Sequence, residues 1–258
     1  MHVFPAMLSA AAIALLSGCG APDAEPDERP ADSRHPVDIA VAIDRTAILH
    51  GDQALAQAYR AAVLTAVEPT ITRGGRLSIR LFGKVGAHSL DIRSETVPTL
   101  REEGVAVRGP GETDRREAVA AALDVALGLT EPTPDIRRSL EAVTPGSGSD
   151  IARVVGQELE AAASGTAPES VVLVLTDGVV NDGEIVVSGE PAEVGLAIAK
   201  QAGVPEDTER VSRLRVAGIG LTSGGEAPDA DRVEHLVASW KAACDALPAE
   251  RCEISAKP

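Results

Sequence analysis

The sequence predicts an α/β domain in which a mostly parallel sheet is covered by helices on both faces. Two continuous apolar runs, VDIAVAI at 37–43 and SVVLVLT at 170–176, are typical of parallel strands that are buried on both sides. Alanine-rich stretches with helical spacing alternate with these runs and with further short β-rich segments. Such alternation is built from right-handed crossover connections, which produce a doubly wound sheet.

The predicted elements follow one another from residue 37 to the C-terminus. We expect strands at 37–43, 76–83, 170–176, 213–219 and in the terminal CEISA, with 88–97 pairing against 76–83 as an edge hairpin. We expect helices at 52–68, 114–128, 149–163, 190–202 and 230–246. Ser149 is the predicted N-cap of the third helix. The predicted architecture is a Rossmann-like, doubly wound, mostly parallel sheet with one antiparallel edge strand.

The region 98–148 fits this alternation least well. Apart from the predicted helix, it is rich in glycine, proline and charged residues. We therefore expect long surface loops or an insertion there.

Residues 1–18 are predicted to be a secretory signal rather than part of the fold. Pro5 to Leu16 is a short apolar stretch, well below the ~20 residues that span a bilayer as a helix. It ends in small residues around Cys19, as signal segments do. The string LSGC resembles the lipobox of bacterial lipoproteins, which implies cleavage before Cys19 and acylation of that cysteine. An ordinary cleaved signal, in which Cys19 has no special role, is the alternative.

Residues 19–36 are predicted to form the lipidated cysteine and a tether, followed by the folded domain at 37–258. The segment 20–36 holds four prolines and five acids, so it favours an extended chain over a packed one. The net charge of −15 argues against nucleic acid as a partner, and the aromatic content of 2% argues against base stacking. We therefore expect a bacterial, extracytoplasmic domain that touches the cell membrane through its lipid anchor alone.

The other two cysteines, Cys244 and Cys252, lie close together near the C-terminus. In an oxidising compartment a disulfide between them is the expected state, and it would pin the last helix to the final segment. A metal-binding pair and two reduced, buried thiols are the alternatives.

Acidic and hydroxyl side chains follow the two most apolar strands. Asp44 comes directly after the first, and Asp177 comes after the second. Thr46 lies near Asp44, and the loop PGSGSDI at 145–151 offers Ser149 where a helix begins. Ligands of open α/β sheets bind outside the carboxyl ends of the strands, and carboxylate and hydroxyl oxygens suit Mg²⁺, Ca²⁺ or Mn²⁺.

These residues resemble the metal-ion-dependent adhesion site of von Willebrand factor A domains, whose motif is Asp-x-Ser-x-Ser, a later Thr and a later Asp. Asp44 matches the first Asp, Thr46 the first hydroxyl, Ser149 the Thr, and Asp177, in LVLTDG, the last Asp. The string LVASWKAACDAL also resembles the family's closing helix. The resemblance covers roughly residues 37–256, and it implies that Asp44, Thr46, Ser149 and Asp177 hold a divalent cation.

One position departs from that motif, because Ile48 stands where the family has its second serine. Ile48 cannot ligate a metal, and other domains of this fold bind partners without one, so metal-dependent and metal-independent binding both stay open. Each acid also has a structural interpretation. Asp177 with Gly178 is typical of a turn, and Asp44 could pair with Arg45 or a surface charge.

The expected function is protein binding by a membrane-anchored lipoprotein. The family resemblance implies that the partner supplies an acidic side chain to the cation. A metal-independent scaffold and a solute-binding lipoprotein are alternatives. A hydrolase is disfavoured because no Gly-x-Ser-x-Gly, His-Glu-x-x-His or Walker string is present. We therefore expect no enzymatic activity. We also expect His235 to lie on the surface and Trp240 to lie in the core.

Overall fold

The central sheet has six strands in the order β3–β2–β1–β4–β5–β6. The computed structural model describes residues 35–44, 53–82, 90–91, 112–130, 150–180, 189–221 and 229–258. The parallel strands are β1 (Val37–Asp44), β2 (Leu77–Phe82), β4 (Glu169–Leu175), β5 (Arg213–Ala217) and β6 (Cys252–Ser255). β3 (Leu90–Asp91) pairs antiparallel with β2 at one edge. The predicted doubly wound sheet with one antiparallel edge strand is confirmed.

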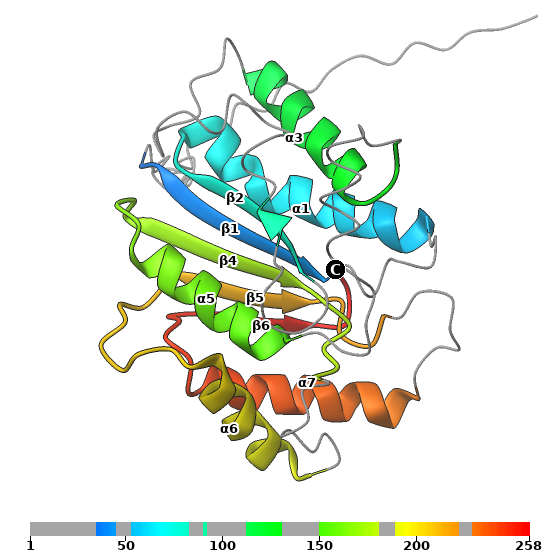
Figure 1. The fold of residues 1–258 in the computed structure, drawn as a ribbon, viewed down its shortest axis with the longest axis vertical. Coiled ribbons are helices and arrows are strands. Elements are labelled where there is room, and N and C mark those ends of the chain that lie inside the picture. Colours follow the sequence, from blue (N-terminus) through cyan, green and yellow to red (C-terminus); the bar gives the residue numbers. More distant parts are fainter. Residues whose placement is uncertain are drawn as a thin grey trace, which may run out of the picture. The chain divides into compact units, whose positions relative to one another are not determined.

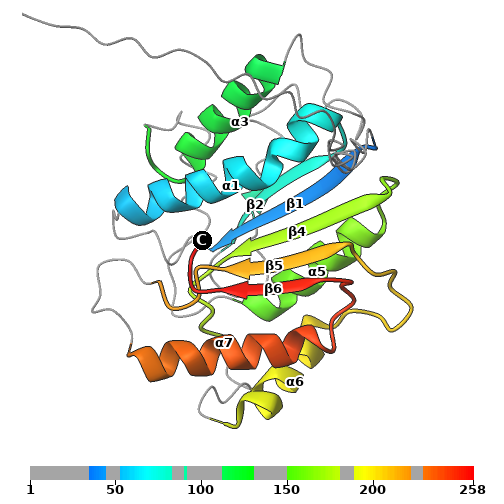
Figure 2. The same ribbon diagram turned by 180° about the vertical axis from the view of Figure 1, so that it is seen from behind.

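Helices cover both faces of this sheet, as Figures 1 and 2 show from opposite sides. α1 (Gln53–Arg73) and α3 (Glu112–Ala126) pack on one face. α5 (Ile151–Ala163), α6 (Pro191–Ala202) and α7 (Ala230–Cys244) pack on the other. Within the described ranges, none of the helices combines the length and apolar character needed to cross a membrane.

β1 lies between two hydrophobic cores, which explains its unbroken apolar sequence. Its side chains alternate in direction. Ile39, Val41 and Ile43 join the core beneath α1 and α3, here called the first core. Ala40 and Ala42 join the core beneath α5, α6 and α7, here called the second core. All eight residues of the strand are buried. The carboxyl end of β1 therefore delivers Asp44 into the interior of the domain.

α1 continues farther than the sequence predicted. The sequence pattern predicts a helix over 52–68, and the proline that follows at residue 69 removes a backbone hydrogen bond inside a helix. The helix instead runs through Pro69 to Arg73. The buried Thr70 hydroxyl donates a 2.8 Å hydrogen bond to the carbonyl of Val37, and Ile71 packs in the first core. These tertiary contacts hold the last turn against the start of β1 and outweigh the local preference of proline.

α5 has Asp150 as its N-cap, so the prediction of Ser149 as the cap is wrong. The backbone N–H of Arg153 donates to Asp150 Oδ1 over 3.2 Å, and the Arg153 guanidinium pairs with Oδ2 at 2.9 Å. A carboxylate here satisfies a free N–H and is favoured by the helix dipole. Because the other end of α5 leads into β4, the start of α5 lies at the carboxyl edge of the sheet (Figure 1).

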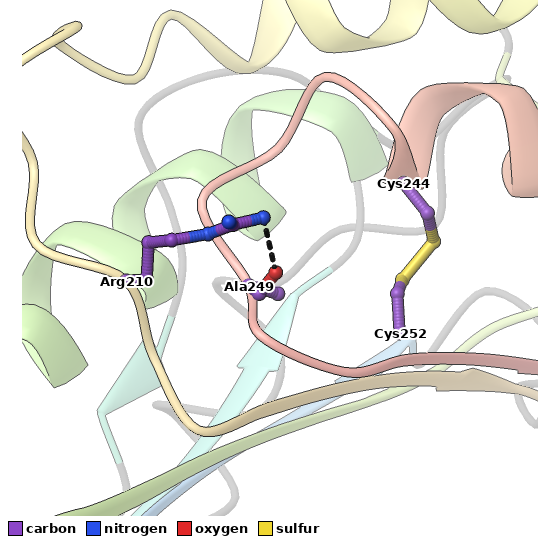
Figure 3. The surroundings of a disulfide bond; sticks show 4 residues. All are labelled: Arg210, Cys244, Ala249 and Cys252. Carbon is purple, nitrogen blue, oxygen red and sulfur yellow. Dashed lines mark hydrogen bonds between the residues drawn. A yellow bond between two sulfur atoms is a disulfide. The ribbon is translucent and has the colours of Figure 1, made fainter.

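A disulfide joins Cys244, the last residue of α7, to Cys252, the first residue of β6 (Figure 3). Their Cα atoms lie 5.9 Å apart, within the usual range for a disulfide. The turn that the bridge closes is also held by Arg210, whose guanidinium donates a 2.8 Å hydrogen bond to the carbonyl of Ala249. The predicted bridge is confirmed, and it fixes the end of α7 to the edge strand.

Candidate functional site

Asp44 ends β1 as a fully buried acid, with 0% of its surface exposed. The hydroxyl of Thr176 donates a 2.9 Å hydrogen bond to Asp44 Oδ2. Thr176 follows β4 directly, and the register of the sheet pairs Ile43 with Leu175. The side chains of Asp44 and Thr176 therefore meet because they leave neighbouring parallel strands at the same level.

Asp177 begins a tight turn at the end of β4. Its Oδ1 accepts a 2.9 Å hydrogen bond from the N–H of Val179, and its carbonyl accepts a 2.7 Å bond from the N–H of Gly220. Gly178 has a φ of +76°, which favours glycine. A Cβ atom there would lie 2.4 Å from the Cδ1 of Ile219. The turn expected from the sequence is present, and it holds Asp177 in one place.

Trp240 fixes the same turn from α7. Its ring is completely buried in the second core, as predicted, and its Nε1–H donates a 3.0 Å hydrogen bond to the carbonyl of Gly178. The N–H of Gly178 in turn donates to the hydroxyl of Thr176 over 3.1 Å. One hydrogen-bonded chain thus links α7, the turn after β4 and Asp44, so the position of the acids is set by the core.

The two acids share one electrostatic environment. Burial, and then the negative charge of Asp44, raise the pKa of Asp177 from 3.8 to about 6. The hydrogen bond from Val179 and the charge of Arg232 act in the opposite direction without cancelling this rise. The folded protein therefore holds the proton of Asp177 more tightly than a free chain does.

Tyr59 on α1 brings a phenol into the same environment. Burial, followed by the charges of Asp44 and Asp177, raises the pKa of Tyr59 well above its ordinary value, so the hydroxyl stays protonated. The side chain is fully buried, and among the described residues its hydroxyl has no hydrogen-bond partner. A Cβ atom at Gly218, just after β5, would lie 3.0 Å from this hydroxyl. The phenol thus reaches the carboxyl ends of the strands.

Of the four predicted metal ligands, the structure brings Asp44 and Asp177 into one charged environment. Thr46 and Ser149 lie outside the described residues, as does Ile48. Their part in a metal site stays a prediction.

The sequence prediction missed Thr176 and Tyr59. The sequence pattern places Thr176 at the end of a buried strand. Its position immediately before Asp177 indicates that its hydroxyl lies at the carboxyl edge of the sheet, beside the acids. Tyr59 lies four residues from both Leu55 and Val63 on the core face of α1, and it is the only tyrosine of the chain. A phenol on that face needs a polar partner, which could have marked it.

Asp44 and Asp177 are the carboxylates that the described part of this edge offers to a ligand. Within the described ranges, no group of three or more His, Cys, Asp and Glu side chains is arranged to hold a metal ion. The carboxylates of Asp44 and Asp177 supply oxygen donors of the kind that Mg²⁺, Mn²⁺ and Ca²⁺ prefer. These residues fit a divalent cation if hydroxyl oxygens, predicted to come from Thr46 and Ser149, complete the set.

His235 agrees with its prediction only in part. We expected this residue of α7 on the surface, and it is half-buried: its Nε2 atom is buried and has no hydrogen-bond partner in the part of the chain that the structure describes. The helical spacing of Leu236 and Trp240 turns this side of α7 towards the protein.

Comparisons with known proteins find distant likenesses. No family model and no curated protein matches the chain. The PilB minor pilin from Streptococcus sanguinis has a TM-score of 0.44 and 10% identity, with 88% of this chain and 58% of that chain covered. BatB from Bacteroides thetaiotaomicron has a TM-score of 0.34 and 11% identity, with 86% and 91% covered.

A third structure is the vWF domain of the type V pili tip protein Mfa5 from Porphyromonas gingivalis. Its TM-score is 0.31 at 15% identity, with 57% of this chain and 39% of that chain covered. The chain spans less than two thirds of the lengths of the pilin and of this tip-protein structure. The mostly parallel sheet with one antiparallel edge strand, and the place of Asp44 and Asp177 at the ends of β1 and β4, agree with what the von Willebrand A resemblance implies.

Proposed function

We propose that this domain binds a protein partner at the carboxyl edge of its sheet, through a divalent cation. Asp44 and Asp177 would hold the cation together with Thr46 and Ser149. The cation would supply a positively charged coordination position, and the partner would fill it with an acidic side chain. Binding of this kind joins two negatively charged surfaces, which suits a chain with a net charge of −15.

We further propose that the domain works outside the cytoplasm. The lipid on Cys19 would anchor it to the bacterial cell membrane, and residues 20–36 would hold it away from the bilayer. The disulfide between Cys244 and Cys252 supports this placement, because such bridges persist in oxidising compartments.

The observation that supports a cation most strongly is the buried acid pair. Burying one carboxylate is costly, and placing a second beside it adds repulsion, as the raised pKa of Asp177 records. Hydrophobic or amide side chains would fill the same space with less electrostatic cost. Two buried acids at the edge where α/β sheets bind ligands therefore support a positively charged ligand.

Partner binding without a metal is the second candidate, and one observation favours it. Both acids accept hydrogen bonds from the protein, Asp44 from Thr176 and Asp177 from Val179. Such bonds allow the acids to act as structural residues that shape a metal-free surface. We assign no catalytic residue in either case. Hydrolases that use an aspartate after a buried strand as nucleophile need a second acid two residues later, and Thr46 occupies that position after Asp44.

Isothermal titration of Mg²⁺, Mn²⁺ and Ca²⁺ into the full chain tests the cation. Asp44→Asn and Asp177→Asn should abolish saturable binding. Asp38→Asn is the matched control, because Asp38 is a buried acid at the other end of β1, where the N–H and the guanidinium of Arg76 hold it at 2.7 and 3.1 Å. Equal binding by all four proteins would contradict a site at this edge, and absence of binding by the folded wild type would favour the metal-free alternative.

The role in partner binding needs a separate readout. Proteins captured from the cell envelope by the immobilised chain should be retained in Mg²⁺, released by a chelator, and absent when Asp177→Asn is the bait. Capture that is the same in Mg²⁺ and in chelator would contradict a cation-mediated contact.

A further inference from the structure

The hydroxyl of Tyr59 is a buried polar group that the described protein leaves without a partner. Its residue is 0% exposed, and among the described residues no hydrogen bond reaches the oxygen. A buried hydroxyl without a partner costs free energy, which is why such groups are nearly always bonded to protein, water or an ion. A phenylalanine would fill the same space without this cost, so the hydroxyl needs an explanation.

The packing of the Tyr59 ring places its hydroxyl near the candidate site. α1 carries Tyr59 on the face that packs in the first core with Ile43 and Leu175, the last core residues of β1 and β4. The hydroxyl lies beside Gly218, at a place where an added Cβ atom would be 3.0 Å from it and 3.0 Å from the carbonyl of Thr176. The hydroxyl therefore lies close to Gly218, just after β5, and near the carbonyl of Thr176, the residue that precedes Asp177.

The chemistry of the phenol decides what kind of partner it can have. A phenol is protonated at neutral pH, and its O–H can donate one hydrogen bond. Because this hydroxyl is buried without a partner among the described residues, a suitable partner is an acceptor oxygen. A bare cation offers no acceptor, whereas a water molecule bound to a cation offers its oxygen lone pair.

We propose that Tyr59 is a positioning residue of the cation site, whose hydroxyl donates a hydrogen bond to a water molecule in the coordination sphere of a divalent cation at Asp44 and Asp177. This inference rests on the proposed function. Tyr59 would hold this water in place from the side of α1.

The test compares the full chain with Tyr59→Phe and with a matched control, Thr70→Val. Thr70 is also a buried hydroxyl of α1, but it donates to the carbonyl of Val37 at the opposite end of β1. Mn²⁺ and Mg²⁺ affinities are measured by isothermal titration, and stability is measured by urea unfolding in the presence of a chelator.

Tyr59→Phe should weaken Mn²⁺ and Mg²⁺ binding about 10- to 100-fold, the usual effect of removing a group that orients a metal ligand. Its urea midpoint without metal should be equal to or above that of the wild type, because an unpartnered buried hydroxyl has been removed. Thr70→Val should show the reverse pattern, a lower midpoint with unchanged metal affinity. The residence time of water on bound Mn²⁺, measured by oxygen-17 relaxation, should be shorter in Tyr59→Phe.

Two results would overturn the inference and leave the proposed function standing. One is equal metal affinity in the wild type and Tyr59→Phe. The other is a lowered urea midpoint of Tyr59→Phe without metal, which would show that the hydroxyl has a partner in the metal-free protein. Absence of metal binding by the wild type would overturn both proposals together.

An independent measurement uses the fact that the chain has one tyrosine. Addition of Mg²⁺ to the wild type should shift the tyrosine absorption band, because the phenol gains an acceptor. The shift should be missing from the corresponding difference spectrum of Tyr59→Phe. A wild-type spectrum that does not change at saturating Mg²⁺ would overturn the inference.

Discussion

Replacing Asp177 by asparagine should stabilise the metal-free protein at neutral pH and have little effect near pH 4. The pKa of Asp177 is about 6 in the folded protein and 3.8 in a free chain. This difference of about two pH units corresponds to roughly 3 kcal/mol, at ~1.4 kcal/mol per unit. Asparagine has no charge to bury, and its Oδ1 can still accept the hydrogen bond from Val179.

The sign follows from proton binding in the two states. Because the pKa is higher in the folded state, the folded protein holds the proton of Asp177 where the unfolded chain has already lost it. The free energy of unfolding therefore falls, through this group, as the pH rises from about 4 to about 6. Above that window the loss is complete, and below it both states are protonated and the loss disappears.

The assay is urea unfolding of the wild type and Asp177→Asn in chelator, at steps from pH 4 to pH 8. The difference in the free energy of unfolding between the two proteins should grow by up to about 3 kcal/mol in favour of the variant across the window. Taking this difference removes the titration of groups that both proteins share. A difference that does not vary with pH, or that grows in favour of the wild type, would refute the electrostatic account of the edge.

Three further predictions concern the fold and the phenol. Replacing both Cys244 and Cys252 by serine should lower the free energy of unfolding by about 2.5 kcal/mol in urea titrations, as expected for a short closed loop; no change would contradict a bridge that constrains the unfolded chain. Gly156→Ala should cost about 1–3 kcal/mol in the same assay despite its better helix propensity, since the new Cβ would lie 1.9 Å from the carbonyl of Ala202 in α6. The phenolate absorbance of Tyr59 should be absent from the folded protein at pH 10, where the unfolded chain is about half ionised; a normal titration of the native protein would contradict its burial.

The framework of the site could be predicted because it depends on sequence patterns that are local. A continuous apolar run specifies a strand buried on both faces, and strand–helix alternation makes such strands parallel. Asp44 and Asp177 follow two such runs, and β1 and β4 are neighbours in the sheet. Their convergence on one edge was therefore predictable without knowledge of any side-chain contact.

The remaining details depend on contacts between distant segments. The hydroxyl of Thr176 bonds to Asp44 across 132 residues of sequence, and the orientation of Tyr59 depends on the ends of β4 and β5. The last turn of α1 persists after Pro69 because Thr70 bonds to Val37. No local propensity records such contacts, which is why the sequence prediction ended that helix too early.

The helix cap shows a different limit. Serine and aspartate are nearly equal as N-caps, so propensity does not choose between Ser149 and Asp150. The structure selects Asp150, whose side chain is held by both the backbone N–H and the guanidinium of Arg153. An error of one residue in the start of the helix therefore matters for the site. It decides whether Ser149 or Asp150 caps the helix, and which of the two is left to bind a ligand.

The most direct test of the central claim is the position of Mn²⁺ in a crystal of the full chain grown with that ion. An anomalous difference map should place Mn²⁺ at the carboxyl edge of the sheet, in contact with ligands that include Asp44 and Asp177 or waters bound to them. Mn²⁺ elsewhere on the protein, with both acids bonded only to Thr176, Val179 and other protein groups, would contradict a cation site and make the acid pair a structural feature.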